Sequence, residues 1–77
     1  MTGSELRAKR QMFGLAGSLI CKQTGIKRSR LSDIERGYVQ PSDTELAQID
    51  RALDELIRAK KEVASTAERV GWPVAAL

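Results

Sequence analysis

Apolar side chains recur at intervals of three and four along the first 40 residues, a spacing that predicts short amphipathic helices. Leu6 and Phe13 form one inward stripe, and Leu31 and Ile34 form another. Glycines interrupt the pattern between these stripes and mark the ends of the helices. The pattern therefore predicts three short helices over residues 3–13, 16–24 and 28–36.

A longer apolar repeat follows Pro41 and predicts a fourth helix. Ser42 is placed to cap its start, and no glycine or proline interrupts it before Gly71. A second capping box at Ser65 and Glu68 offers the alternative of a break near Ser65. The apolar positions follow a heptad rhythm with one polar interruption, at Leu46, Ile49, Leu53, Leu56, Lys60, Val63, Ala67 and Val70.

The turn between the second and third helices has the residues that a close helix crossing requires. Gly25 can adopt a positive φ and turn the chain sharply, and Ile26 is expected to fill the corner. Cys21 is small and expected to be buried, which lets the third helix approach its backbone. The outward side of the third helix is polar, with Arg28, Ser29, Ser32, Asp33 and Arg36. Such a pair of helices fits the major groove of DNA.

These positions together resemble the phage-repressor and Cro type of helix-turn-helix family. The family pattern is matched without a gap by Gly14-Leu15, Cys21, Gly25-Ile26, Leu31-Ser32 and Ile34-Glu35-Arg36-Gly37. An unrelated helical hairpin with a solvated basic face would not match so many positions in one register. The resemblance implies an all-α, compact, lambda-repressor-like bundle with a long C-terminal helix. It covers roughly residues 4–57, so we expect a DNA-binding domain over residues 1–57, and the heptad rhythm beyond it predicts a helical extension for dimerisation, residues 58–77.

The resemblance also implies roles for individual side chains. Base edges would be read from the third helix by Arg28, Ser29, Ser32 and Asp33. Arg28 suits guanine O6 and N7, and Asp33 suits a cytosine amino group, unless Asp33 pairs with Arg30 or Arg36 within its helix. Phosphates would be bound by Lys27, Arg30, Arg36, Arg7, Lys22 and Tyr38, with backbone amides of the loop after Gly37. Behind this face, the family pairs an arginine and a glutamate, here Arg10 and Glu35.

The sequence departs from the family pattern where its helices begin. Ala16-Gly17 stands in place of the usual Thr-Gln, which removes a side-chain cap and leaves Ser18 as a later candidate. Thr24 replaces a larger apolar residue. Lys27 replaces the usual Ser or Thr cap of the third helix, although a cation is locally unfavourable at a helix N-terminus. Neutralisation of DNA phosphate is the expected compensation.

Size and charge fit a small DNA-binding protein that associates with itself. A chain of 77 residues supports only a marginal core, so dimerisation is an expected source of further burial. Residues 1–40 carry eight Lys or Arg against three acids, and residues 41–77 carry five against seven. A basic half joined to a mildly acidic half indicates a nucleic-acid face and a separate partner face.

The composition argues against several other classes of protein. A single cysteine excludes an internal disulfide, and the lack of histidine argues against a zinc site. No cofactor is expected. No apolar run approaches the ~20 residues of a membrane span, and no signal-peptide core opens the chain, so we expect a cytoplasmic protein. No carboxylate pair or nucleophile with a base suggests an enzyme.

The pattern as a whole predicts a dimeric, sequence-specific repressor of a palindromic operator, of the kind found in phages, prophages and mobile elements. The expected dimerisation residues are Leu56, Lys60, Val63, Ala67, Val70 and Trp72. One alternative for the end of the chain is a solvated tail. Another is an antitoxin-like protein-binding module, in which the last helix masks a toxin and DNA binding is autoregulatory.

Overall fold

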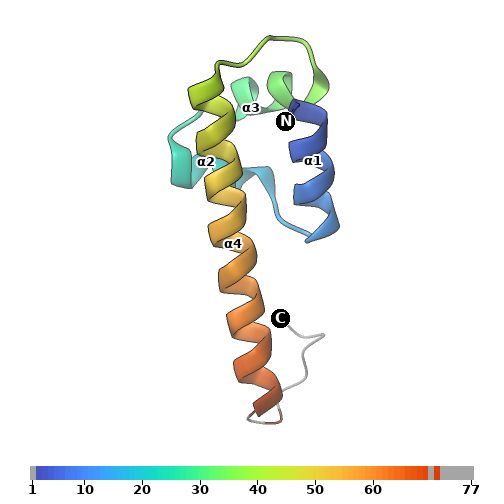
Figure 1. Ribbon diagram of the computed structural model, residues 1–77, viewed down its shortest axis with the longest axis vertical. Coiled ribbons are helices and arrows are strands. Elements are labelled where there is room, and N and C mark those ends of the chain that lie inside the picture. Colours follow the sequence, from blue (N-terminus) through green and yellow to red (C-terminus); the bar gives the residue numbers. More distant parts are fainter. Residues whose placement is uncertain (1, 70, 72–77) are drawn as a thin grey trace.

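The computed structural model describes residues 2–69 and 71, and every regular element in that part of the chain is a helix. The helices are α1 (Gly3–Met12), α2 (Gly17–Thr24), α3 (Arg28–Arg36) and α4 (Asp43–Arg69) (Figure 1). The predicted all-α class and the long last helix are confirmed. In Figure 1, α1, α2 and α3 gather around the amino-terminal half of α4, and its other half extends away from them.

The hydrophobic core lies where α1, α2 and α3 meet the first half of α4. Its buried members are Leu6, Leu15, Ile20, Leu31, Ile34, Ile49, Ala52, Leu53 and Ile57. Ile57 is the last of them, so the twelve residues of α4 from Arg58 to Arg69 lie beyond the core. The molecule is accordingly elongated, with principal extents of 45 × 20 × 18 Å.

The buried stripe of α4 is wider than the heptad pattern predicted. Ala52 and Ile57 are buried although neither belongs to the heptad, whereas Leu46 and Leu56 are only half-buried. The physical reason is that α4 packs against both α1 and α2, and a helix covering two neighbours needs an apolar arc broader than an a/d seam. The alternative of a break near Ser65 is not realised, since α4 continues to Arg69.

Two neighbouring lysines of α4 hold the end of α1. Lys60 donates a hydrogen bond from Nζ to the Phe13 carbonyl oxygen over 2.6 Å. Lys61 places its Nζ 5.6 Å from the centre of the Phe13 ring, within the range of a cation–π contact. The polar interruption in the heptad pattern therefore has a partner within the chain.

The helix ends follow the turn chemistry that the sequence indicates. Gly25 has φ 77° and donates its N–H to the Cys21 carbonyl oxygen, which ends α2. Gly37 has φ 79° and ends α3 in a Schellman motif, with Tyr38 N–H bonded to the Asp33 carbonyl oxygen. Ser42 caps α4 by accepting the Glu45 N–H, as predicted.

One expectation about a side-chain position needs correction, and another lies outside the described part of the chain. Cys21 is half-buried rather than buried, because it lies at the edge of the core that Ile20 fills completely. Val70 and Trp72, and the side chain of Ala67, lie outside the described residues.

Candidate nucleic-acid interface

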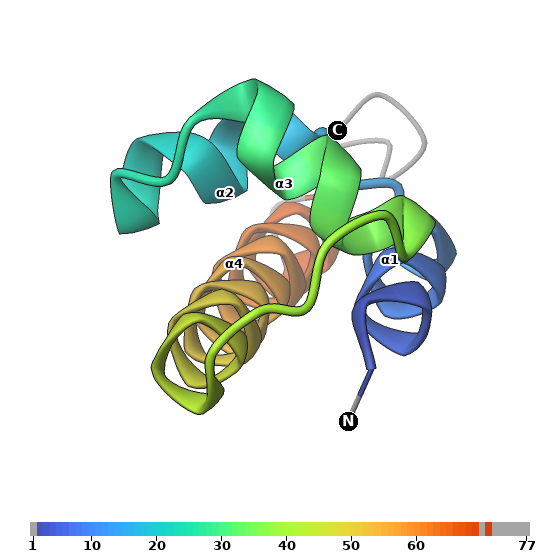
Figure 2. The ribbon, with the colours of Figure 1, turned by 90° about the horizontal axis from the view of Figure 1, so that it is seen from above.

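Helix α3 is held between α1 and α2 and leaves one side open (Figure 2). Leu31 and Ile34 bury its inner side, each with 1% of its surface exposed. Arg28 and Ser29 at its start are exposed, and Ser32 and Asp33 one turn later are half-buried. The four predicted base-reading side chains therefore belong to the first two turns of a firmly packed helix.

Asp33 forms no ion pair with another described residue, so the alternative of a pair with Arg30 or Arg36 is not realised. Its backbone carbonyl is occupied by the Tyr38 N–H in the end of α3. The carboxylate is thus left available on the helix.

A small basic hollow lies where α1, α2 and α3 converge. It is lined by Arg7, Arg10, Gly17, Arg28, Leu31, Ser32, Glu35 and Arg36. Its volume of about 180 Å³ is below the range of small-molecule pockets, which run from about 300 to 1,000 Å³. The hollow therefore brings together three arginines predicted to bind phosphate or read bases, Arg7, Arg28 and Arg36.

Gly17 lies beside one of these arginines, at ordinary van der Waals distance. A Cβ at Gly17 would lie 3.6 Å from Cζ of Arg28 and 3.5 Å from Cδ2 of Leu31. The Arg28 guanidinium thus lies over the start of α2, where the family usually has a longer side chain. Ala16 precedes this start and provides no side-chain cap, and Ser18 lies inside α2 without replacing it, contrary to one expectation.

The predicted ion pair behind α3 is present. Arg10 donates from Nε and Nη2 to the two carboxylate oxygens of Glu35, over 2.9 and 3.0 Å. It also donates from Nη1 to the Leu15 carbonyl oxygen over 2.8 Å. Because Glu35 is only 8% exposed, the pair joins α1, α3 and the loop between α1 and α2 largely out of water.

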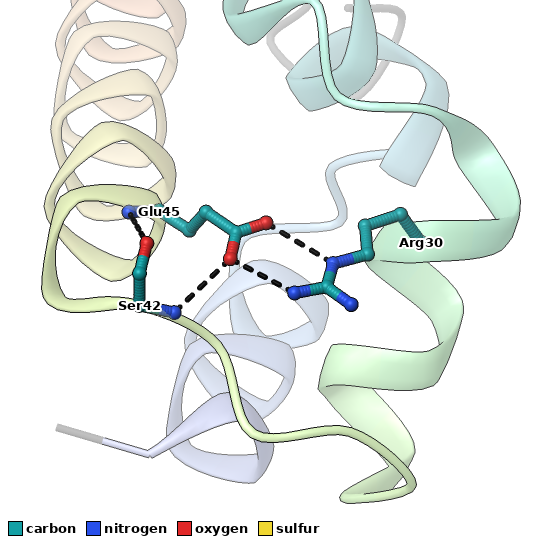
Figure 3. A network of polar contacts seen from close by, with 3 residues as sticks. All are labelled: Arg30, Ser42 and Glu45. Carbon is teal, nitrogen blue, oxygen red and sulfur yellow. Dashed lines mark hydrogen bonds and ion pairs between the residues drawn. The ribbon is translucent and has the colours of Figure 1, made fainter.

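Arg30, which the resemblance places among the phosphate contacts, forms an ion pair with α4 that the sequence did not indicate. Its guanidinium donates from Nε and Nη2 to the carboxylate of Glu45, over 3.1 and 2.9 Å (Figure 3). Glu45 also accepts the Ser42 N–H, completing the capping box of α4. The Arg30 hydrogen bonds, followed by the Ser42 N–H, lower the pKa of Glu45 from 4.5 to about 2. Arg30 therefore links α3 to α4, and its predicted contact with phosphate stays a prediction.

The remaining predicted phosphate contacts are Lys22, Lys27 and Tyr38, and these residues do not line the hollow. Lys22 and Lys27 are exposed on α2 and at the start of α3, and Lys27 makes no side-chain cap. The Tyr38 side chain is 72% exposed. Its N–H, and that of Gly37, bond to carbonyls of α3, so these amides are used by the helix end and are not free for phosphate.

Some ion pairs between helices could not be predicted from the sequence. Lys9 pairs with Asp50 and Asp54 over 3.0 and 2.7 Å, 41 and 45 positions away. These hydrogen bonds, first that to Asp54, raise the pKa of Lys9. Such partners are identified only once α1 and α4 are placed side by side.

Thr24 shows how one departure from the family pattern is accommodated. Its hydroxyl donates to the Ile20 carbonyl oxygen over 2.7 Å and accepts the Ile26 N–H over 3.2 Å. The polar side chain thereby stabilises the turn into α3 by hydrogen bonds instead of apolar contact.

Comparison with known protein families agrees with this geometry. A family model described as "Helix-turn-helix" matches residues 6–57. The chain belongs to this helix-turn-helix family. The matched segment begins at Leu6 and ends at Ile57, the first and last residues of the buried core. Searches of curated proteins and of solved structures gave no match.

Family membership makes the protein a DNA-binding regulator of transcription. The helix-turn-helix is formed by α2 and α3, which lie within the matched residues. Among the described residues, no helix has the length and apolar character needed to cross a membrane.

Proposed function

We propose that this helix-turn-helix protein is a sequence-specific repressor of phage, prophage or mobile-element type that binds a palindromic operator as a dimer. The observation that carries the proposal is the open side of α3. It combines a cation, two hydroxyls and a carboxylate on a helix that the Arg10–Glu35 pair fixes from behind. Such a side chain set distinguishes base pairs by hydrogen bonds in the major groove.

The side chains divide by the kind of contact they make. Arg28 donates to guanine O6 and N7, and Asp33 accepts from a cytosine amino group, with Ser29 and Ser32 between them. Phosphates are bound by Arg7, Lys22, Lys27, Arg36 and the Tyr38 hydroxyl. Rotation of Arg28 away from the uncapped start of α2 also relieves its repulsion by the positive end of that helix dipole.

Dimerisation would involve the half of α4 beyond the core. Val63 is 52% exposed there, with no apolar neighbour in the core to cover it. Of the other predicted interface residues, Leu56 is half-buried in the chain's own core and Lys60 is bonded to Phe13. A two-fold dimer presents its recognition helices to successive major grooves, about 34 Å apart.

Selection from random DNA duplexes tests the proposal, followed by affinity measurements over a range of salt. Arg28→Ala is expected to lose preference at one base pair, worth about 1–3 kcal/mol of discrimination. Lys22→Ala is expected to weaken all sequences alike and to reduce the slope of log K against log salt by about one. Lys61→Ala removes the same charge from α4, away from α3, and is the matched control with no change in slope.

Two results would contradict this proposal, one at the level of DNA binding and one at the level of base reading. One is an affinity for duplex DNA that is flat between low and physiological salt, because phosphate contacts require counterion release. The other is an unchanged base preference in Arg28→Ala, which would remove Arg28 from base reading.

A further inference from the structure

The side of α4 that faces away from the core carries an alternating row of charges. Arg51, Glu55, Arg58 and Glu62 follow one another at steps of four, three and four, so they share one helix face. All four side chains are exposed. None of them forms an ion pair or a hydrogen bond with another described residue.

The charges of this row do not pair within their own helix in the structure. Arginine precedes glutamate in the two pairs at four-residue spacing, Arg51–Glu55 and Arg58–Glu62, which is the weaker order, although Glu55 and Arg58 at three-residue spacing have the favourable one. The row is instead complementary to a copy of itself. Its signs run positive, negative, positive, negative, and an antiparallel copy presents the opposite sign at each position.

We propose that this face of α4 docks against the same face of a second copy of the chain, antiparallel, about a two-fold axis at the level of Leu56 and Ile57. Arg51 then lies opposite the partner's Glu62, and Glu55 lies opposite the partner's Arg58. Two-fold symmetry repeats both pairs, which gives four ion pairs. The inference rests on the proposed dimer, and it puts the interface on the charged face of α4 instead of the heptad stripe that carries Leu56, Lys60 and Val63.

The same register accounts for the length of α4. It places residues 58–69 of one copy beside residues 44–55 of the other. A groove between α2 and α4 lies along that segment, lined by Gln23, Thr24, Thr44, Ala47, Gln48, Arg51, Ala52 and Glu55. Every residue that α4 contributes to the groove falls within 44–55. The half of α4 that covers no core in its own chain therefore covers the groove of its partner.

Small side chains allow the two helices to approach. Ala47 and Ala59 are exposed and flank the charged row on either side. Val63, the exposed valine of this half, continues the heptad stripe and lies outside this interface. The alanines let the two helices approach, while the charges set the antiparallel direction and the register, as they do in other helix pairs.

Sedimentation equilibrium of the full chain and its charge variants tests the interface. Arg58→Glu and Glu55→Arg each place like charges opposite one another twice, and each is expected to raise the dimer dissociation constant about tenfold or more. The exchange Glu55→Arg/Arg58→Glu restores opposite charges across the axis and is expected to return the constant to within about threefold of the wild type. Glu5→Arg on α1 makes the same charge change as Glu55→Arg and is the matched control, with circular dichroism confirming that each variant is folded.

Each outcome decides the question. Dissociation of both single variants together with rescue by the exchange supports the interface. A wild type that stays monomeric, single variants that dimerise unchanged, or an exchange that fails to rescue would each overturn it. Binding of the same samples to a single half-site duplex separates the two proposals, because salt-dependent binding there leaves DNA recognition standing whatever the interface.

Discussion

Arg10 and Arg30 illustrate how differently two arginines of one small protein can be identified. Each donates two hydrogen bonds to one glutamate, Arg10 to Glu35 and Arg30 to Glu45. The first pair followed from the family pattern. The second pair joins α3 to α4 across a loop, and nothing in the sequence near either residue predicts that the two side chains meet. An arginine on the recognition helix is therefore not assigned to DNA by its position alone.

Gly3 provides a sharp test at the residue scale. It is buried at the start of α1, and a Cβ there would collide with the carbonyl oxygen of Ile34 in α3. Because backbone must move to relieve the collision, Gly3→Ala is expected to lower the free energy of unfolding by about 1–3 kcal/mol. Urea denaturation measures it, with Gln11→Ala on the exposed side of α1 as control. Equal stabilities of Gly3→Ala and the wild type would show that α1 and α3 are not this close.

At the scale of elements, the ends of the helices determine how α3 is presented. Gly25 and Gly37 end α2 and α3 through backbone hydrogen bonds. The starts of α2 and α3 have no side-chain cap, whereas α4 begins with a full capping box. The weakly capped elements are the two of the helix-turn-helix, so under the proposed function their free N–H groups remain available for phosphate oxygens.

The link between α3 and α4 predicts a pH dependence. The Arg30 hydrogen bonds lower the pKa of Glu45 from 4.5 to about 2 in the folded state. The stabilisation is therefore fully present above pH 4.5 and is lost as the pH falls towards 2. Glu45→Gln keeps a side chain that can complete the capping box but removes the ion pair. We expect it to melt below the wild type near pH 6 and to match it near pH 2.

Thermal melts between pH 2 and pH 7 provide this measurement. Glu5→Gln removes a carboxylate that makes no ion pair with a described residue and is the control for the loss of one negative charge. If the Glu45→Gln difference did not shrink towards pH 2 by more than that of the control, the ion pair would not contribute to stability.

The whole molecule combines a compact end and an extended end. The core finishes at Ile57, and α4 continues for twelve residues to Arg69. Lys60 and Lys61 tie the beginning of that extension to Phe13. The compact end has all the buried contacts that the fold requires, and the extension is the part that association with another chain would cover.

Truncation after Ile57 separates these two roles. Residues 1–57 retain the entire described core, so this fragment is expected to keep its helical circular dichroism and to melt cooperatively. It is expected to be a monomer by light scattering at concentrations where the full chain is a dimer. A truncated chain with the same mass state as the full chain would show that α4 beyond Ile57 is not the interface.

The sequence by itself determined the helices, their glycine ends and the Arg10–Glu35 pair, because period, turn chemistry and a gapless family pattern are all local in the chain or matched residue by residue. Tertiary structure decided the partners of Arg30, Lys9 and Lys60, since each lies across a loop or on another helix. It also decided which side of α4 remains open. A heptad pattern marks apolar positions without stating which neighbours cover them. Here α1 and α2 cover the apolar side of α4 as far as Ile57, and the charged side faces outward.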